Sequence, residues 1–162
     1  MQQTENLPFT LKDRECGECT KCCEGRLEAV IYGQRMHPGN PCRFLCKSNG
    51  CTIYNDRPEN PCRIYKCAWI ADDTFPLWMQ PHLTNIIINK KTALNDAITY
   101  YDVIEAGGKM SAETLNWLLT WALKNRKNIS YEILGRVHHL GDGPFVQYMN
   151  ERDRKDAQKV KG

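Results

Sequence analysis

The chain has 162 residues, of which 41% are hydrophobic and 25% are charged, and its formal net charge is +3. This length and composition predict one globular domain that buries a hydrophobic core without help. A net charge this small gives no reason to expect nucleic acid or an acidic membrane as a partner. The longest apolar runs are far shorter than the roughly 20 residues that cross a bilayer, so no membrane span is predicted.

The cysteines point to metal rather than to disulfides. The opening residues MQQTENLPFT lack a basic segment followed by an apolar run, so we expect no signal peptide and a cytoplasmic location. Stable disulfides are uncommon in that reducing compartment, and the total of nine cysteines is odd. Metal binding or redox chemistry is therefore favoured. Disulfides stay an alternative if the protein matures outside the cytosol, for example in a virion.

The chain divides by chemistry into three parts of one domain. All nine cysteines lie in residues 16–67, which form a cysteine-rich metal-binding module. Residues 68–150 contain a hairpin and helices, and residues 151–162 form a charged tail. In the module, Pro, Gly and Asn stand directly before cysteines in HPGNPC, KSNGC and DRPENPC. These residues predict turns that present sulfur rather than long helices.

Regular secondary structure is predicted after residue 69. The runs LTNIIINKK (83–91) and AITYYDVIEAGG (97–108) indicate two strands joined by a polar turn. Ser111 is a suitable N-cap for a helix whose apolar residues recur at helical spacing. These residues are Leu115, Trp117, Leu118, Leu119, Trp121 and Ala122.

A second helix is predicted to begin near Phe145, with Val146, Tyr148 and Met149 facing inward, and to fray into the charged tail. The predicted fold is therefore a small α+β domain. Its turn-rich cysteine module packs on a β-hairpin and one or two helices.

The most informative stretch is RECGECTKCCEG, residues 14–25. Cys16, Cys19 and Cys22 form a C-x-x-C-x-x-C run, which in bacterial ferredoxins binds three corners of a four-iron cluster. The ferredoxin run continues with a fourth cysteine after three more residues, whereas here Cys23 is adjacent and the next cysteine is Cys42. A fourth ligand must therefore come from a distant part of the chain.

The neighbours Cys22 and Cys23 would point apart in an extended or turn backbone, so they could serve two different metal sites. The nine thiols allow two four-sulfur sites with one spare, or one such site with several free thiols. Thiolate ligands suit both zinc and iron–sulfur clusters. The ferredoxin-like run favours at least one iron–sulfur cluster, of the 4Fe–4S type, with zinc as the alternative.

The strings CGECTKCC, NPCRFL, GCTIYNDRPENPCRIYKCAWI and PLWMQPHLTNIII resemble the CxxCxxCC cysteine-cluster family of zinc- or iron-chelating domains, also described as iron–sulfur-cluster-containing proteins. The resemblance covers residues 16–90 best. It implies a metal-binding protein of bacterial or bacteriophage origin, in a family whose reaction is mostly unassigned; some relatives combine the motif with flagellin lysine methylation. The positions that match as metal ligands are Cys16, Cys19, Cys22, Cys23, Cys42, Cys51, Cys62 and Cys67. Cys46 lies outside the pattern.

Arginines and aromatic residues near the cysteines have simpler predicted roles. Arg57 is expected to bind backbone carbonyls in a turn, with a hydrogen bond to a cluster sulfur as the alternative for it and for Arg63. Aromatic residues are expected to form an apolar wall around the site. They are Phe44, Tyr54 and Trp69.

Other polar residues are not expected to form a site. His37 could complete a mixed Cys/His metal site, but the surplus of cysteines makes an imidazole ligand unnecessary. His138 and His139 are adjacent and cannot share one helix face, so they do not suggest acid–base chemistry. Asp72 and Asp73 are predicted to start a turn or cap a helix.

Two functions follow from these features. The first is an iron–sulfur protein with a redox or accessory role, in which Cys16, Cys19, Cys22 and one distant cysteine hold a cluster. The second is a structural or adaptor protein, a component of a phage assembly for example, whose loops are stapled by zinc or by a cluster. Both imply a protein partner, and the sequence contains no pair of residues that identifies an enzyme.

Overall fold

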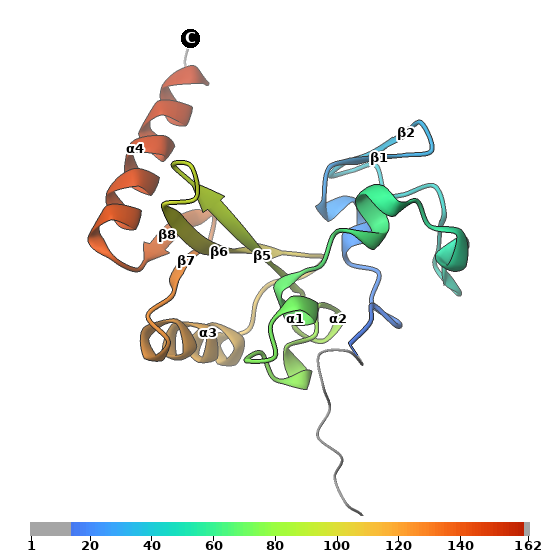
Figure 1. Ribbon diagram of the computed structural model, residues 1–162, viewed down its shortest axis with the longest axis horizontal. Helices are drawn as coiled ribbons and strands as arrows, with labels where there is room; N and C mark the ends of the chain where they lie inside the picture. The colour runs from blue at the N-terminus through green and yellow to red at the C-terminus, as the bar shows by residue number, and fades with distance from the viewer. Residues whose placement is uncertain (1–13, 161–162) are drawn as a thin grey trace, which may run out of the picture.

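The computed structural model describes residues 14–160 and has an α+β fold, as the sequence predicts. A four-stranded sheet lies at the centre of the molecule, the helices α3 and α4 lie on its two sides, and the cysteine module extends from one end (Figure 1). No helix in residues 14–160 is both long enough and apolar enough to cross a membrane.

The sheet has the strand order β5-β6-β7-β8. Its strands are β5 (Ile86–Ala93), β6 (Ile98–Glu105), β7 (Asn128–Ile133) and β8 (Arg136–Leu140). The antiparallel pair β5–β6 is the predicted hairpin, and β7–β8 forms a second hairpin. The strands β6 and β7 are parallel, so the helix α3 (Ala112–Lys124) is the crossover that connects them.

Alternation along β6 gives the sheet two apolar faces. Tyr101 and Val103 face the larger core, where Leu118 and Trp121 of α3 pack. Residues two apart on the other face, Ile98 and Tyr100, pack instead on α4 (Gly143–Lys159). Successive side chains of a strand point to opposite faces, so β6 joins the two cores.

The predicted helices both form. The Ser111 side chain accepts a hydrogen bond from the backbone N–H of Thr114 at 3.1 Å, which confirms the predicted N-cap of α3. The second helix, α4, begins two residues before Phe145, where Asp142 caps it by accepting from the Phe145 N–H at 2.9 Å. It also continues to Lys159, so the fraying predicted for the charged tail is wrong over most of that tail.

The strands β7 and β8 are missing from the sequence prediction. His138 and His139 lie in β8, so they point to opposite sides of a strand and not around a helix. His138 stacks on Tyr131, and His139 binds the Asp153 carboxylate at 2.8 Å. Both histidines have structural contacts far from the cysteines, as expected for residues outside a site.

The cysteine module consists of short elements, as its turn residues predict. Two small hairpins, β1 (Ala29–Ile31) with β2 (Gln34–Met36) and β3 (Leu45–Cys46) with β4 (Gly50–Cys51), are joined by irregular turns. Its remaining short elements are η2 (Cys22–Arg26), η3 (Tyr54–Asp56) and η4 (Glu59–Arg63); α1 (Ala68–Ala71), η5 (Leu77–Met79) and α2 (Pro81–Thr84) follow it and lead to β5. The fully buried cluster among the hairpins contains only Ile31, Met36 and Cys42. So small a core gives little stability by itself.

Candidate metal centre

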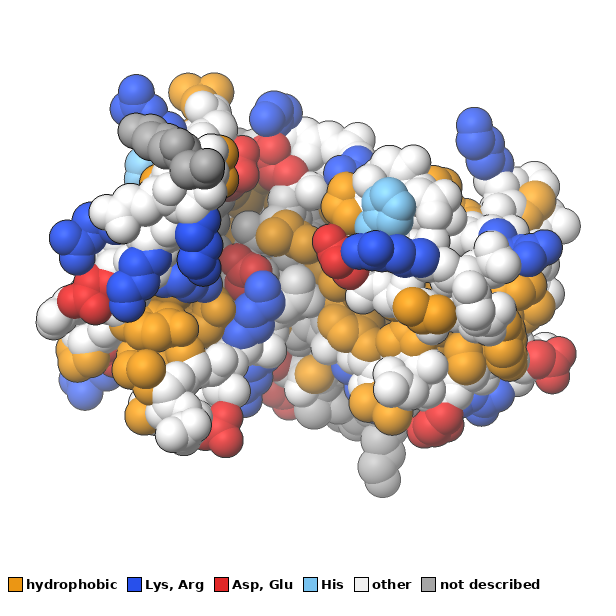
Figure 2. All heavy atoms as spheres, turned by 90° about the horizontal axis from the view of Figure 1, so that it is seen from above, with side chains coloured by type: hydrophobic (Ala, Val, Ile, Leu, Met, Phe, Trp, Pro, Cys, Tyr) orange, Lys and Arg blue, Asp and Glu red, His pale blue; other side chains and the backbone are white. Residues whose placement is uncertain are grey.

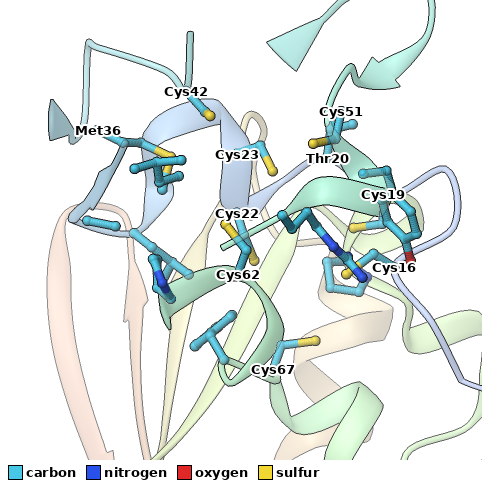
Figure 3. A pocket seen from close by; sticks show the side chains of 18 of the residues that line it. Cys16, Cys19, Thr20, Cys22, Cys23, Met36, Cys42, Cys51, Cys62 and Cys67 are labelled. Atoms are coloured by element: carbon cyan, nitrogen blue, oxygen red, sulfur yellow. The ribbon is translucent and has the colours of Figure 1, made fainter. Parts of the chain in front are cut away.

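Eight cysteines surround one cavity of about 250 Å³ between the cysteine module and the main core (Figure 3). They are the eight that the sequence analysis selected: Cys16, Cys19, Cys22, Cys23, Cys42, Cys51, Cys62 and Cys67. The ninth, Cys46, lines a separate and more open groove. The structure thus brings residues 51 positions apart in the chain to the wall of one cavity.

Tight turns place the first cysteines. The Cys19 N–H donates to the Cys16 carbonyl at 2.8 Å, and Cys22 and Cys23 both lie in η2. The chain leaves η2 through Gly25, whose φ is +83°, and a Cβ at this position would lie 2.3 Å from the His37 carbonyl oxygen. Only glycine permits this approach, which brings the segment before Cys42 against η2.

Cys16, Cys19, Cys22 and Cys67 form one group, hereafter the first group. Burial raises the pKa of the Cys22 thiol, and the next contributions come from the thiols of Cys67, Cys19 and Cys16. Burial likewise raises the pKa of Cys67 to about 11, with contributions from Cys16 and Cys19. Cys67, at the start of α1, is therefore the candidate for the distant fourth member expected for the C-x-x-C-x-x-C run.

Cys23, Cys42, Cys51 and Cys62 form the second group. Burial raises the pKa of Cys23 to about 12, and the largest further contributions come from the thiols of Cys42 and Cys51. The same two thiols raise the pKa of Cys62 after burial. The Cys42 N–H also donates to the Cys23 carbonyl at 2.8 Å. In the view of Figure 3, Cys23, Cys42 and Cys51 lie in the upper part of the cavity, Cys16 and Cys19 lie at its right and Cys67 lies below, with Cys22 and Cys62 next to each other in the middle.

The thiols line the cavity without converging on one point. Among residues 14–160, no three Cys, His, Asp or Glu side chains gather closely enough to hold a single ion. The cavity is also about twenty times the roughly 10–15 Å³ that one water molecule needs. The donor set fits soft metals, since each group offers four sulfurs, and the space fits a group of several atoms better than one bare ion.

Arg57 lies between the two groups. Its guanidinium stacks 3.7 Å from the ring centroid of Tyr54, and its charge lowers the pKa of both Cys16 and Cys62, against the larger effect of burial. Its Nε is buried and has no hydrogen-bond partner within residues 14–160. The carbonyl-binding role predicted for Arg57 belongs instead to Arg63, which donates to the Arg57 and Asn55 carbonyls at 2.9 and 2.5 Å.

Tyr65 forms part of the cavity wall beside the first group. Its hydroxyl donates to the Asn89 side chain at 2.5 Å. Burial, followed by the thiols of Cys22 and Cys67, raises the pKa of this tyrosine. The sequence analysis missed Tyr65, because nothing in the spacing of RIYKC says which side chain faces the cysteines.

The rest of the wall is mainly apolar, and two of the three predicted aromatic residues, Tyr54 and Trp69, belong to it. Phe44 packs instead on Tyr32, with ring centroids 5.9 Å apart. His37 does not line the cavity, and its Nδ1 lies 2.9 Å from the Pro38 carbonyl oxygen. At the start of α2, Gln80 and Pro81 close the cavity from the side of the main core.

Asp72 behaves as predicted for a turn residue. Its carboxylate accepts hydrogen bonds from the Thr74 backbone N–H at 3.0 Å and from the Thr74 hydroxyl at 2.6 Å. It also accepts from Tyr101 at 3.0 Å, which ties this turn to the sheet. Asp72 therefore has a structural role outside the cavity.

Comparison with known proteins gives no match among family models, curated proteins or solved structures.

Proposed function

We propose that this chain binds an iron–sulfur cluster through the first group and has a redox or accessory role. The observation that supports the proposal is that Cys67 lines the same cavity as Cys16, Cys19 and Cys22 and contributes to the raised pKa of Cys22. This supplies the distant fourth sulfur that a C-x-x-C-x-x-C run needs for a four-iron cluster. The size of the cavity supports a cluster over a lone zinc ion, which four sulfurs at about 2.3 Å would enclose without leaving space.

The charges around the first group are consistent with bound metal. Without metal, burial and the neighbouring thiols raise the pKa of Cys16, Cys22 and Cys67, so these side chains are neutral thiols at neutral pH. A bound cation would stabilise the thiolates and release protons on binding. When bound, an iron–sulfur cluster supplies one-electron chemistry. Arg57 and Tyr65 would then act on its potential through charge and hydrogen bonding.

The second group supports a structural role for metal. Cys23 lies in η2, Cys42 precedes β3, Cys51 lies in β4 and Cys62 lies in η4. A metal ion bound to all four would therefore tie the short elements of the module together. The fully buried cluster of that region has only three residues, and small modules of this kind usually need such a staple. A zinc-stapled or cluster-stapled adaptor is therefore the second candidate function, and its observation is independent of the first group.

The deciding experiment is the metal and acid-labile sulfide content of protein purified without oxygen, together with its visible absorption spectrum. Iron with sulfide and broad sulfur-to-iron charge-transfer bands is the expected result, and reversible reduction of those bands would establish the redox role. Colourless protein with stoichiometric zinc and no iron would overturn the proposal in favour of the adaptor. If the cluster can be reduced only when the protein unfolds, the role of the cluster is purely structural.

A further inference from the structure

A second groove, of about 570 Å³, lies on the surface between the cysteine module and the sheet. Its walls come from the end of η2, from the residues after η4, and from the middle of β5 and β6. Viewed from above, the molecule shows a hollow between its two halves with both basic and acidic side chains around it (Figure 2). Four basic residues line the groove: Arg26, Lys66, Lys90 and Lys91. We call it the basic groove.

The basic groove has excess positive charge. Arg26, Lys66 and Lys90 are exposed, and none of them forms a salt bridge with another residue in the range 14–160. The two carboxylates of the groove already have partners: Asp102 pairs with Lys91, and Glu28 lies 3.8 Å from Arg35. Three cations are thus left to interact with an acidic surface.

The basic groove and the cysteine cavity share a wall. Leu27, Glu28 and Tyr65 line both of them. The Tyr65 hydroxyl donates to the groove residue Asn89, and Cys22 of the first group contributes to the raised pKa of the same tyrosine. The Tyr65 side chain is therefore shared by the proposed cluster site and the groove.

The groove also offers apolar surface. Ile64 is 63% exposed at its edge, and Ile104 of β6 is half-buried beside it. Charged residues around a small apolar contact suit a transient protein complex, because charge guides the encounter and limited burial permits release. An open groove with paired carboxylates inside it is less suited to a nucleic acid strand, which needs exposed aromatic rings for stacking.

We propose that the basic groove docks the acidic face of a one-electron carrier protein. This inference rests on the proposed function, since it adds a partner for the same cluster site. A cluster held by the first group would accept one electron from the reduced carrier, which would be oxidised, and no bond would form or break. Tyr65 lines both the cavity and the groove and so lies between the two partners.

Binding of a small acidic carrier tests the docking surface without reference to electron transfer. The probe is oxidised plant-type [2Fe–2S] ferredoxin, titrated at low ionic strength into full-length protein purified without oxygen. The test variant is the double substitution Lys66→Glu with Lys90→Glu. The matched control is Lys124→Glu with Lys155→Glu, which makes the same charge change at exposed positions on α3 and α4.

We expect the Lys66/Lys90 variant to weaken ferredoxin binding at least tenfold and the control variant to change it less than threefold. Salt should weaken binding to the wild type steeply, because exposed charges are screened. Equal weakening in both double variants would mean that net charge alone is responsible and would overturn the inference. Tighter binding of a 12-nucleotide single strand than of ferredoxin, lost in the Lys66/Lys90 variant, would assign the groove to nucleic acid instead.

A second readout is the rate at which reduced ferredoxin passes its electron to the protein, followed by stopped-flow absorption. It should fall in the Lys66/Lys90 variant, whereas reduction by dithionite should be the same in all three proteins. The two proposals fail separately. Protein without iron refutes the cluster but leaves the binding result standing, whereas a normal cluster with binding unaffected by Lys66→Glu and Lys90→Glu refutes only the docking surface.

Discussion

Cys22 and Cys23 are consecutive in η2 and both line the cavity, but different cysteines act on them. After burial, the thiols of Cys67, Cys19 and Cys16 raise the pKa of Cys22 most, whereas those of Cys42 and Cys51 raise the pKa of Cys23 most. Adjacent residues in the irregular turn η2 point in different directions, so one dipeptide contributes to both groups. This explains how a doubled cysteine would serve two metal sites that are otherwise built from different segments.

Serine substitutions at these two positions should remove different parts of the metal content. Cys22→Ser is expected to abolish the charge-transfer absorption of the cluster and to leave metal in the second group. Cys23→Ser should do the reverse, so that each variant retains the metal of one group only. Iron, sulfide and zinc analysis measures this, with Cys46→Ser as the control because Cys46 lies outside the cavity. Loss of all metal in both variants would mean that the eight thiols form one joint site.

The eight cysteines selected from the sequence all line one cavity, but their arrangement in it was not predictable. The C-x-x-C-x-x-C spacing identifies three members of the first group, because local spacing fixes their geometry. Cys67 could not be assigned as the fourth, since its position beside Cys22 depends on how η4 and α1 pack, 45 residues later in the chain. The same holds for Tyr65 and for the basic groove, which combine segments that only the tertiary fold brings together.

The fold shows the same division between local and long-range information. The β5–β6 hairpin and α3 were predictable, because apolar runs, a polar turn and an N-cap serine are local signals. The strands β7 and β8 were missed because NISYEI and RVHHL do not alternate clearly and are stabilised by pairing with β6 and packing on α4. In β8 the two exposed residues Arg136 and Val137 are followed by two histidines with tertiary contacts, so burial does not alternate along the strand.

Replacing Arg57 should shift the potential of a cluster in this cavity. Arg57→Gln removes the positive charge that acts on both Cys16 and Cys62, so the reduced, more negative cluster loses stabilisation. We expect a midpoint potential more negative by about 60 mV, which is a tenfold change in the equilibrium constant of a one-electron reduction. Arg57→Lys should give a smaller shift. Potentiometric titration followed by visible absorption measures it. Arg43→Gln, an exposed arginine of the same module, is the control, and an equal shift in that variant would contradict a specific role for Arg57.

Gly25 should be the least replaceable glycine of the module. In Gly25→Ala the new Cβ would lie 2.3 Å from the His37 carbonyl oxygen, and the backbone would keep a φ of +83° that alanine disfavours. We expect a loss of more than about 3 kcal/mol in the free energy of unfolding, together with reduced metal content. Urea unfolding measures the first effect. Gly33→Ala is the matched control, with a φ of +76° but open space around its Cβ, and should cost only about 1–2 kcal/mol. Similar losses in both variants would show that the clash with His37 is unimportant.

Tyr101 links the main core to the turn at Asp72, and its ionisation should limit stability at high pH. Burial and the Asp72 carboxylate raise the pKa of Tyr101 from 10 to about 12. Between these pH values the folded protein keeps the phenol proton and the unfolded chain loses it, so the free energy of unfolding falls as the pH rises.

Tyr101→Phe removes this pH dependence, but it also removes the 3.0 Å hydrogen bond to Asp72, and this loss costs about 1 kcal/mol at neutral pH. The variant should therefore be less stable than the wild type at pH 7, and the difference should shrink and then reverse between pH 10 and 12. Denaturant unfolding across that range tests this, with Tyr148→Phe on α4 as the control. A constant difference at all pH values would contradict the raised pKa of Tyr101.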